Sequence, residues 1–216
     1  MTRLGSLKQL VPPSIVRQKL SVKGCILFTF DDGPDPEITP RVLDVLDEYG
    51  ARGLFFIPGS RIERAPDLLK EIITRKHGIG NHSLTHVSND TLSFKELIHE
   101  ITACRDKIFS LTGITTDLYR PPRGITTLPL LVAATYCKHR VMRWSLDVGE
   151  YGSMKDATSA EMAENFLQRV HDRAIVVSHD DKETTPEFLK LVLPRMIDSG
   201  FDVKTGLVDS GWRYGT

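Results

Sequence analysis

The chain has 216 residues and carries 28 Lys and Arg against 28 Asp and Glu, so its formal net charge is zero and its isoelectric point is near 7.1. This length is typical of a single α/β domain with a sizeable core. A balanced charge gives no basic field that would attract nucleic acid or an anionic membrane, so we expect no nucleic-acid partner.

The three cysteines and the N-terminal residues exclude further classes. Cys25, Cys104 and Cys137 are far apart and outside any CxxC spacing, which argues against a disulfide framework or a thiolate zinc site. The first twenty residues lack the unbroken apolar run of a secretory signal, because Pro12-Pro13 interrupts it. No segment reaches the roughly 18 apolar residues of a membrane helix. We therefore expect no membrane span and a cytoplasmic protein by default, with export not excluded.

Strand and helix patterns alternate along the chain. Short apolar, β-rich runs predict strands at 25–30, 53–58, 78–82, 117–120, 141–145, 174–179 and 201–205. Apolar residues at three- and four-residue intervals predict helices over 36–49, 65–76, 93–111, 126–136, 159–170 and 185–199, with Ser93 and Ser159 as N-cap candidates. The alternation predicts a mainly parallel sheet, and about seven units favour a (β/α) barrel over an open doubly wound sheet. Residues 1–20 are predicted to be an N-terminal extension.

Ionisable residues gather where the predicted strands end, which is where a barrel carries its active site. Asp31 and Asp32 follow the first strand and precede a Gly33-Pro34 turn. Taken alone, this Asp pair is more typical of a turn than of a site. The ends of later strands carry His82 and His86, Arg120, Trp144 with Asp147 and Glu150, and His179.

The HSLTH segment indicates a metal site. His82 and His86 are four residues apart, so one helical turn would point both imidazoles the same way, as when two histidines hold one divalent metal. The pair alone is a weak signal. A carboxylate from Asp31 or Asp32 would complete a His₂Asp site with open positions for water, and the other carboxylate would be free to act as a base.

Two further strand ends suggest acid–base groups. A protonated His179 could donate a proton to a leaving amine, and a core histidine is the plain alternative. Arg120 precedes Pro121-Pro122, whose stiff backbone suits holding a guanidinium against a carboxylate. A helix cap or a surface ion pair is the alternative for this arginine. Asp180, Asp181 and Lys182 are expected in a solvated loop that leads into a helix, and one of the two acids could tune His179.

The motifs TFDDGP, HSLTH, RPPRG, WSLDVGEY and VSH resemble, in this order, the five motifs of the NodB-homology polysaccharide deacetylases, carbohydrate esterase family 4. The resemblance runs from about Cys25 to Val208. It implies a distorted (β/α) barrel of seven or eight strands over residues 21–216, an acetylated carbohydrate substrate, and one divalent metal ion: Zn²⁺ first, with Co²⁺, Ni²⁺ or Mn²⁺ as alternatives. The implied roles are general base for Asp31, metal ligands for Asp32, His82 and His86, orientation of Asp31 for Arg120, and general acid for His179.

Three of the motifs depart from the family pattern. Arg123 stands where an aromatic residue is usual. The family uses the backbone N–H of this position to hold the oxyanion, and Arg123 keeps that group. The aromatic ring that lines the sugar groove is lost. Glu150-Tyr151 replaces Asp-Trp, so either Glu150 or Asp147 would contact His179. Val177 replaces a leucine of the acetyl pocket. Trp144 and Tyr151 are expected beside the substrate.

Two other functions stay open. A metal amidohydrolase acting on a small non-sugar amide is favoured by the cationic Arg123, which would suit an anionic substrate. A non-catalytic, carbohydrate-binding pseudoenzyme would be recognised by a missing ligand or base, and none of the predicted ones is missing. The sequence gives no basis for predicting the oligomeric state.

Overall fold

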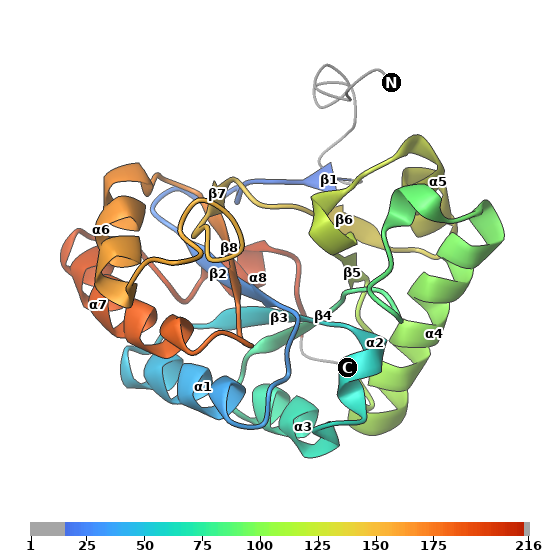
Figure 1. Ribbon diagram of the computed structural model, residues 1–216, viewed down its shortest axis with the longest axis horizontal. Helices are drawn as coiled ribbons and strands as arrows, with labels where there is room; N and C mark the ends of the chain where they lie inside the picture. The colour runs from blue at the N-terminus through green and yellow to red at the C-terminus, as the bar shows by residue number, and fades with distance from the viewer. Residues whose placement is uncertain (1–15, 214–216) are drawn as a thin grey trace.

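The computed structural model describes residues 16–213, whose centre is one curled sheet of eight strands (Figure 1). All neighbouring strands are parallel. Their order across the sheet is β1 (Val16–Arg17), β6 (Arg140–Met142), β5 (Leu118–Tyr119), β4 (Gly78–Asn81), β3 (Gly53–Ile57), β2 (Leu27–Asp31), β8 (Ile175–His179) and β7 (Leu146–Asp147). This half-barrel confirms the distorted (β/α) barrel expected from the sequence.

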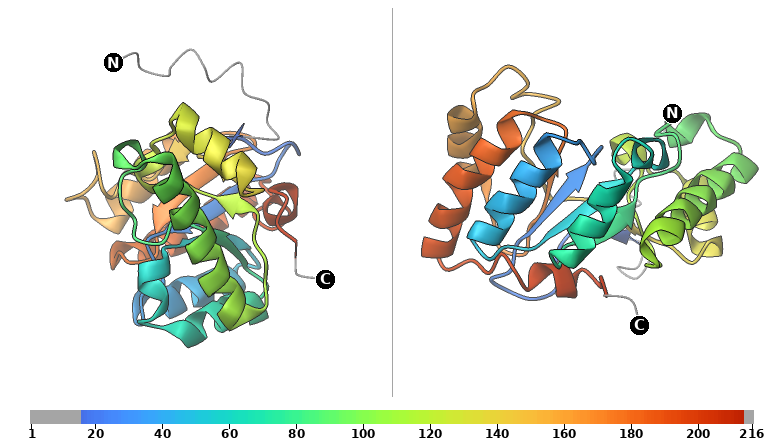
Figure 2. Two further views of the ribbon diagram at one scale, coloured as in Figure 1. Left: turned by 90° about the vertical axis from the view of Figure 1, so that its right-hand side faces the viewer. Right: turned by 90° about the horizontal axis from the view of Figure 1, so that it is seen from below.

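The six predicted helices are present and surround the outside of the sheet (Figures 1 and 2). They are α1 (Ile38–Glu48), α3 (Pro66–Thr74), α4 (Phe94–Thr112), α5 (Leu128–Tyr136), α6 (Ser159–Arg169) and α7 (Thr184–Asp198). The short helices α2 (Gly59–Ile62) and α8 (Gly206–Asp209) and the 3₁₀ turns η2 (Asn89–Thr91) and η3 (Pro122–Gly124) were not predicted. Because helices cover the sheet, the central strands β2 and β3 are buried at every residue.

The helix caps follow the expected chemistry with one correction. Ser93 caps α4 in a capping box with Glu96, as predicted. The N-cap of α6 is Thr158, which accepts from the Glu161 N–H, so the prediction of Ser159 was wrong. Both residues are good caps, and the position of Glu161 three residues after Thr158 decides between them.

The predicted strands at 141–145 and 201–205 also need correction. The first is broken after Met142: Arg143 donates from its N–H to Arg17, and Ser145 to Ile175. The chain therefore passes from β6 at one side of the sheet to β7 at the other without a helix. The second is reduced to a single bridge between Cys25 and Asp202. There the Asp202 carboxylate accepts from the N–H groups of Lys204 and Thr205 and turns the chain toward α8.

Other expectations concern the chain termini and the cysteines. Residues 1–15 of the predicted extension lie outside the described residues, and Val16–Arg17 form the edge strand β1 beside β6. All three cysteines are buried and unpaired. Among residues 16–213, no helix has the length and apolar character that crossing a bilayer requires.

Candidate active site

A pocket of about 520 Å³ opens at the carboxyl ends of the strands. Because the strands are parallel, all of these ends meet at one rim of the sheet. Ten of the twelve predicted site residues line the pocket: Asp31, Asp32, His82, His86, Arg123, Trp144, Asp147, Tyr151, Val177 and His179. The other two, Arg120 and Glu150, are buried behind it.

The aspartate pair lies where β2 ends. Asp31 is the last residue of the strand, directly opposite His179 on β8, and it is buried. Asp32 has φ 69°, a left-handed conformation that aspartate tolerates better than most residues. Both carboxylates border His82 Nε2, with Asp31 Oδ2 at 3.8 Å and Asp32 Oδ1 at 3.6 Å. Gly33 packs so closely that a Cβ there would lie 2.1 Å from the Asp180 carboxylate, so only glycine fits.

Asp32, His82 and His86 form a compact group of metal-type ligands. Their ligand atoms all lie within 4.8 Å of one another. Asp32 Oδ1 lies 3.1 Å from His86 Nε2 and 3.6 Å from His82 Nε2. The second nitrogen of His82, Nδ1, donates to the Arg120 carbonyl at 2.8 Å, which fixes the tautomer with its Nε2 lone pair toward Asp32. Burial lowers the pKa of His82, although Asp31 and Asp32 oppose the effect, and a neutral imidazole is the form that binds metal.

The two histidines converge by a different route from the one predicted. Residues 82–86 form a loop, so the expected helical turn was wrong. Ser83 and His86 have left-handed φ angles of 73° and 62°. The Asn81 side chain accepts from the Ser83 N–H at 2.9 Å, which starts the turn directly after β4. The two imidazole rings lie 4.9 Å apart between centroids.

Arg120 holds Asp31 from below the pocket. It is fully buried, and its Nη1 donates to Asp31 Oδ1 at 2.8 Å and to Thr29 Oγ1 at 2.6 Å. Its guanidinium carbon lies 4.2 Å from the centre of the Phe56 ring. Burial lowers the pKa of Arg120 while Asp31 raises it, and arginine in proteins stays charged. A buried carboxylate is thus paired with a buried, immobile cation.

His179 lines the same pocket as the two aspartates and is paired with Glu150. His179 Nδ1 lies 3.3 Å from Glu150 Oε1 as an ion pair, and that oxygen also accepts from the His179 N–H at 2.9 Å and from Ser178 Oγ at 2.7 Å. Burial alone would lower the pKa of His179, but the Glu150 contact and the charges of Asp31 and Asp32 raise it to about 9. Of the two acids left open by the sequence, Glu150 contacts His179. Asp147 instead accepts from the Gly149 N–H at 2.7 Å.

The remaining predicted residues form the pocket walls. Arg123 is exposed and left-handed, with φ 55°, inside η3. Trp144 packs over Gly124, where a Cβ would lie 2.5 Å from the indole. Tyr151 sets its ring edge-on to His179 at 4.5 Å and donates from its hydroxyl to Asp181 at 3.1 Å. Val177 is buried beneath the pocket.

Comparison with known proteins identifies the family. Residues 19–142 match the family described as polysaccharide deacetylase. The chain belongs to the polysaccharide deacetylase family. It is similar to the peptidoglycan-N-acetylmuramic acid deacetylase PdaC of Bacillus subtilis, with 29% identity over 83% of this chain and 37% of the relative. It is also similar to a peptidoglycan-N-acetylglucosamine deacetylase of Bacillus cereus, with 30% identity over 82% of this chain and 83% of the relative. The chain thus spans well under half of PdaC.

Solved structures of this polysaccharide deacetylase family agree with the fold. The structure of PdaC superimposes with a TM-score of 0.77 at 28% identity and covers 90% of this chain and 89% of that one. A CE4 family pseudoenzyme from Bacillus anthracis superimposes with a TM-score of 0.83 at 22% identity and covers 93% of this chain and 70% of that one, which shows the fold alone.

Two buried acids of this deacetylase-family chain were missed from the sequence. Asp180 was expected in a solvated loop, yet it is fully buried and accepts from the Thr39 hydroxyl at 2.6 Å. Burial raises its pKa to about 7, although the Thr39 hydrogen bond opposes the effect. Glu100 lies on α4 between Leu97 and Ile101 on the face that packs into the core. A charged residue at an apolar position of a helical repeat is the signal that could have identified it.

Proposed function

We propose that this protein is a metal-dependent hydrolase that removes N-acetyl groups, or secondarily O-acetyl groups, from an acetylated polysaccharide or oligosaccharide. The observation that carries the proposal is the convergence of the Asp32, His82 and His86 ligand atoms within 4.8 Å, beside a carboxylate held by arginine and a histidine held by glutamate. The named activities of the relatives support a peptidoglycan amino sugar as the first substrate to test.

The donor set fits one divalent ion. Two imidazoles and one carboxylate are the ligands of many catalytic zinc sites, and imidazole also suits Co²⁺ and Ni²⁺. Mn²⁺ remains an alternative because a carboxylate is present. When bound, such an ion would polarise the acetyl carbonyl and lower the pKa of a water molecule.

Asp31 is the proposed general base. Its Oδ2 lies 3.8 Å from His82 Nε2, so it borders the ligand group, while its Oδ1 is occupied by Arg120. Arg120 therefore leaves one carboxylate oxygen to take the proton from the attacking water. The Arg120 guanidinium gives this buried carboxylate a charge partner at 2.8 Å, and Oδ2 is the oxygen that would accept a proton as a base.

His179 is the proposed general acid. With a pKa of about 9 it is protonated at neutral pH, and the departing amine nitrogen needs a proton because an amide anion is a poor leaving group. A cation on Asp32 would reduce the charge that raises this pKa, which brings the proton closer to transfer. Glu150 keeps the imidazole oriented through Nδ1, so Nε2 is the proposed donor atom.

The residues of the pocket walls are proposed to stabilise the oxyanion and to contact the sugar. The backbone N–H of Arg123 is the proposed oxyanion donor, and one such preorganised donor is typically worth about 3 kcal/mol. Val177 would contact the acetyl methyl group, while Trp144 and Tyr151 would border the sugar. The exposed Arg123 side chain supports the second candidate function, hydrolysis of a small anionic non-sugar amide.

The test is acetate release by chelator-treated protein with and without added Zn²⁺, Co²⁺, Ni²⁺ or Mn²⁺. Substrates would be chitooligosaccharides, peptidoglycan fragments, acetylxylan fragments and a panel of small N-acetylated carboxylic acids. Metal-dependent release from an amino sugar is expected, and release from the small amides alone would favour the second candidate. Metal binding without any release, together with sugar binding, would indicate a pseudoenzyme and contradict the proposal.

A further inference from the structure

Glu100 is a buried acid that belongs to neither the proposed ligands nor the proposed acid–base groups. It lies on α4 and is 7% exposed. Among residues 16–213, no Lys, Arg or His side chain forms an ion pair with it. A buried carboxylate without a cation needs hydrogen-bond donors, so the partners of Glu100 indicate what it does.

All of the donors to Glu100 come from the loop between His82 and His86. Oε2 accepts from the Thr85 N–H at 2.9 Å and from the Ser83 hydroxyl, and Oε1 accepts from the Thr85 hydroxyl at 2.8 Å. One side chain of α4 thus binds both polar residues that separate the two proposed metal ligands.

The loop needs such an anchor because its backbone is strained. Ser83 and His86 are non-glycine residues with left-handed φ angles, which persist only where the surroundings over-determine them. The carbonyls of Ser83 and Leu84 accept from the N–H groups of Gly59 and Ser60 at the start of α2. Glu100 complements these contacts, because it accepts hydrogen bonds from the donor groups of the same segment, those of Ser83 and Thr85.

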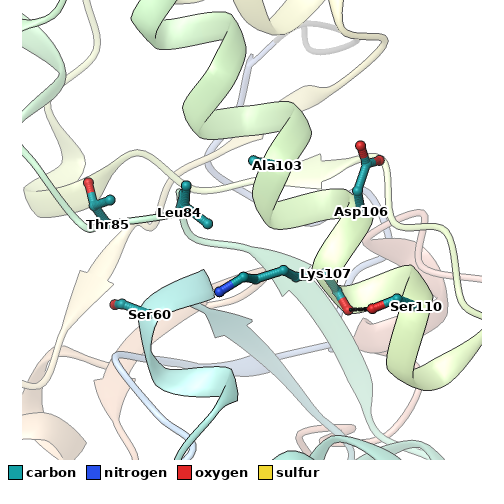
Figure 3. A pocket seen from close by; sticks show the side chains of 7 residues that line it. All are labelled: Ser60, Leu84, Thr85, Ala103, Asp106, Lys107 and Ser110. Carbon is teal, nitrogen blue, oxygen red and sulfur yellow. Dashed lines mark hydrogen bonds between the residues drawn. The ribbon is translucent and has the colours of Figure 1, made fainter.

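The outer side of the loop gives it little further support. Figure 3 shows Leu84 and Thr85 beside α4, with Lys107 reaching across toward Ser60 on α2. These residues border an open groove of about 600 Å³. Asp106 lines the same groove from α4, and its side chain is 65% exposed. Glu100, on the buried face of α4, contacts the loop from the core.

We propose that Glu100 is a positioning residue that preforms the loop so that His82 and His86 face Asp32 before metal binds. The proposal rests on the proposed function only in its assignment of Asp32, His82 and His86 as metal ligands. The reaction itself has no part in it. Loss of an outer contact to a metal ligand commonly weakens metal binding by 10- to 100-fold.

The test compares Glu100→Ala with Glu100→Gln, and measures Zn²⁺ affinity of the stripped protein by competition with a chromophoric chelator. Glu100→Ala should weaken Zn²⁺ binding by about 10- to 100-fold. Glu100→Gln should stay within about threefold, because the amide oxygen can accept two hydrogen bonds and the amide nitrogen can donate to the Thr85 hydroxyl. Asp106→Asn, on the exposed side of the same helix, is the matched control and should leave the affinity unchanged.

A second variant and a second measurement keep the test decisive if Glu100→Ala does not fold. Thr85→Val removes a single hydrogen bond to Glu100 and should weaken Zn²⁺ binding by less than Glu100→Ala. Hydrogen exchange of the backbone amide at position 85 should be slow in the metal-free wild type. It should be faster in Glu100→Ala or Thr85→Val, whichever of them folds.

The outcomes separate this proposal from the proposed function. Wild-type Zn²⁺ affinity in Glu100→Ala, or in Thr85→Val where Glu100→Ala is unfolded, would overturn the role of Glu100 and leave the proposed function standing. Zn²⁺ binding that depends on Glu100 in a protein that releases no acetate would support the role and contradict the proposed function. A wild-type protein that binds no divalent metal would contradict both.

Discussion

Replacing Arg120 by methionine should destabilise the protein strongly, because it leaves the Asp31 carboxylate buried without its cation. Arg120 is fully buried and Asp31 is 4% exposed. The guanidinium donates to Asp31, Thr29 and the carbonyl of Met142, so methionine fills much of its volume against Phe56 but satisfies none of these acceptors. Breaking a buried pair by removing one partner costs about 3–5 kcal/mol.

The assay is urea unfolding of chelator-treated protein, followed by circular dichroism at pH 8. At pH 8 the free energy of unfolding of Arg120→Met should fall by about 3–5 kcal/mol. Arg41→Met is the matched control: Arg41 pairs with Glu183 at 2.7 Å, and both side chains are at least half exposed, so the loss should stay below about 1 kcal/mol. A loss below about 1 kcal/mol for Arg120→Met at pH 8 would refute the reasoning.

Three further predictions concern the pocket and its surroundings. Asp180→Asn should raise the free energy of unfolding at pH 8 by up to roughly 4 kcal/mol and change it little below pH 4. The folded pKa of Asp180, about 7, lies above its unfolded value, so the wild type loses stability as the pH rises from the unfolded pKa to the folded one. An effect of the same size at pH 3.5 in a pH series of denaturant titrations would contradict this. Glu150→Gln should move the alkaline limb of the kcat/KM pH profile to lower pH by at least about one pH unit, because Glu150 raises the pKa of His179; an unmoved limb would remove His179 as the titrating acid. Arg123→Tyr should lower KM for chitooligosaccharides by about two- to tenfold through restored ring stacking, and a raised KM would indicate that the arginine itself binds the substrate.

The sequence predicts the fold well because one signal repeats along the chain. Apolar residues at helical spacing predicted the six long helices, and the buried runs that became β2, β3 and β8 are unmistakable. Short edge strands gave no such signal. Two-residue strands such as β1 and β7 depend on which neighbours the curled sheet offers them.

The site was predictable in its composition and less so in its geometry. Strand-end positions brought Asp31, His82 and His179 to one pocket, as parallel topology requires. The loop from His82 to His86 could not be predicted, because its left-handed residues are stabilised by tertiary contacts with Glu100 and α2. Local pattern carries no information about such contacts.

The separate burial of Asp180 has the same origin. A run of polar residues after a strand usually indicates a solvated loop. Here Gly33, in the turn after β2, packs closely against the Asp180 carboxylate, and the Thr39 hydroxyl donates to it. These two contacts enclose the acid. Only the packing of two loops that are far apart in sequence makes it a buried residue.

The division of roles between Asp31 and Asp32 is the central claim, and one paired measurement tests it most directly. Asp31→Asn and Asp32→Asn would be loaded with Zn²⁺, desalted, and measured for bound metal by elemental analysis and for acetate release from the wild-type substrate. Asp31→Asn should retain about one metal per chain and lose 10²- to 10⁴-fold in turnover, as loss of a general base does. Asp32→Asn should lose both metal and turnover. Near wild-type turnover in both variants, or loss of metal from Asp31→Asn with retention by Asp32→Asn, would contradict the account.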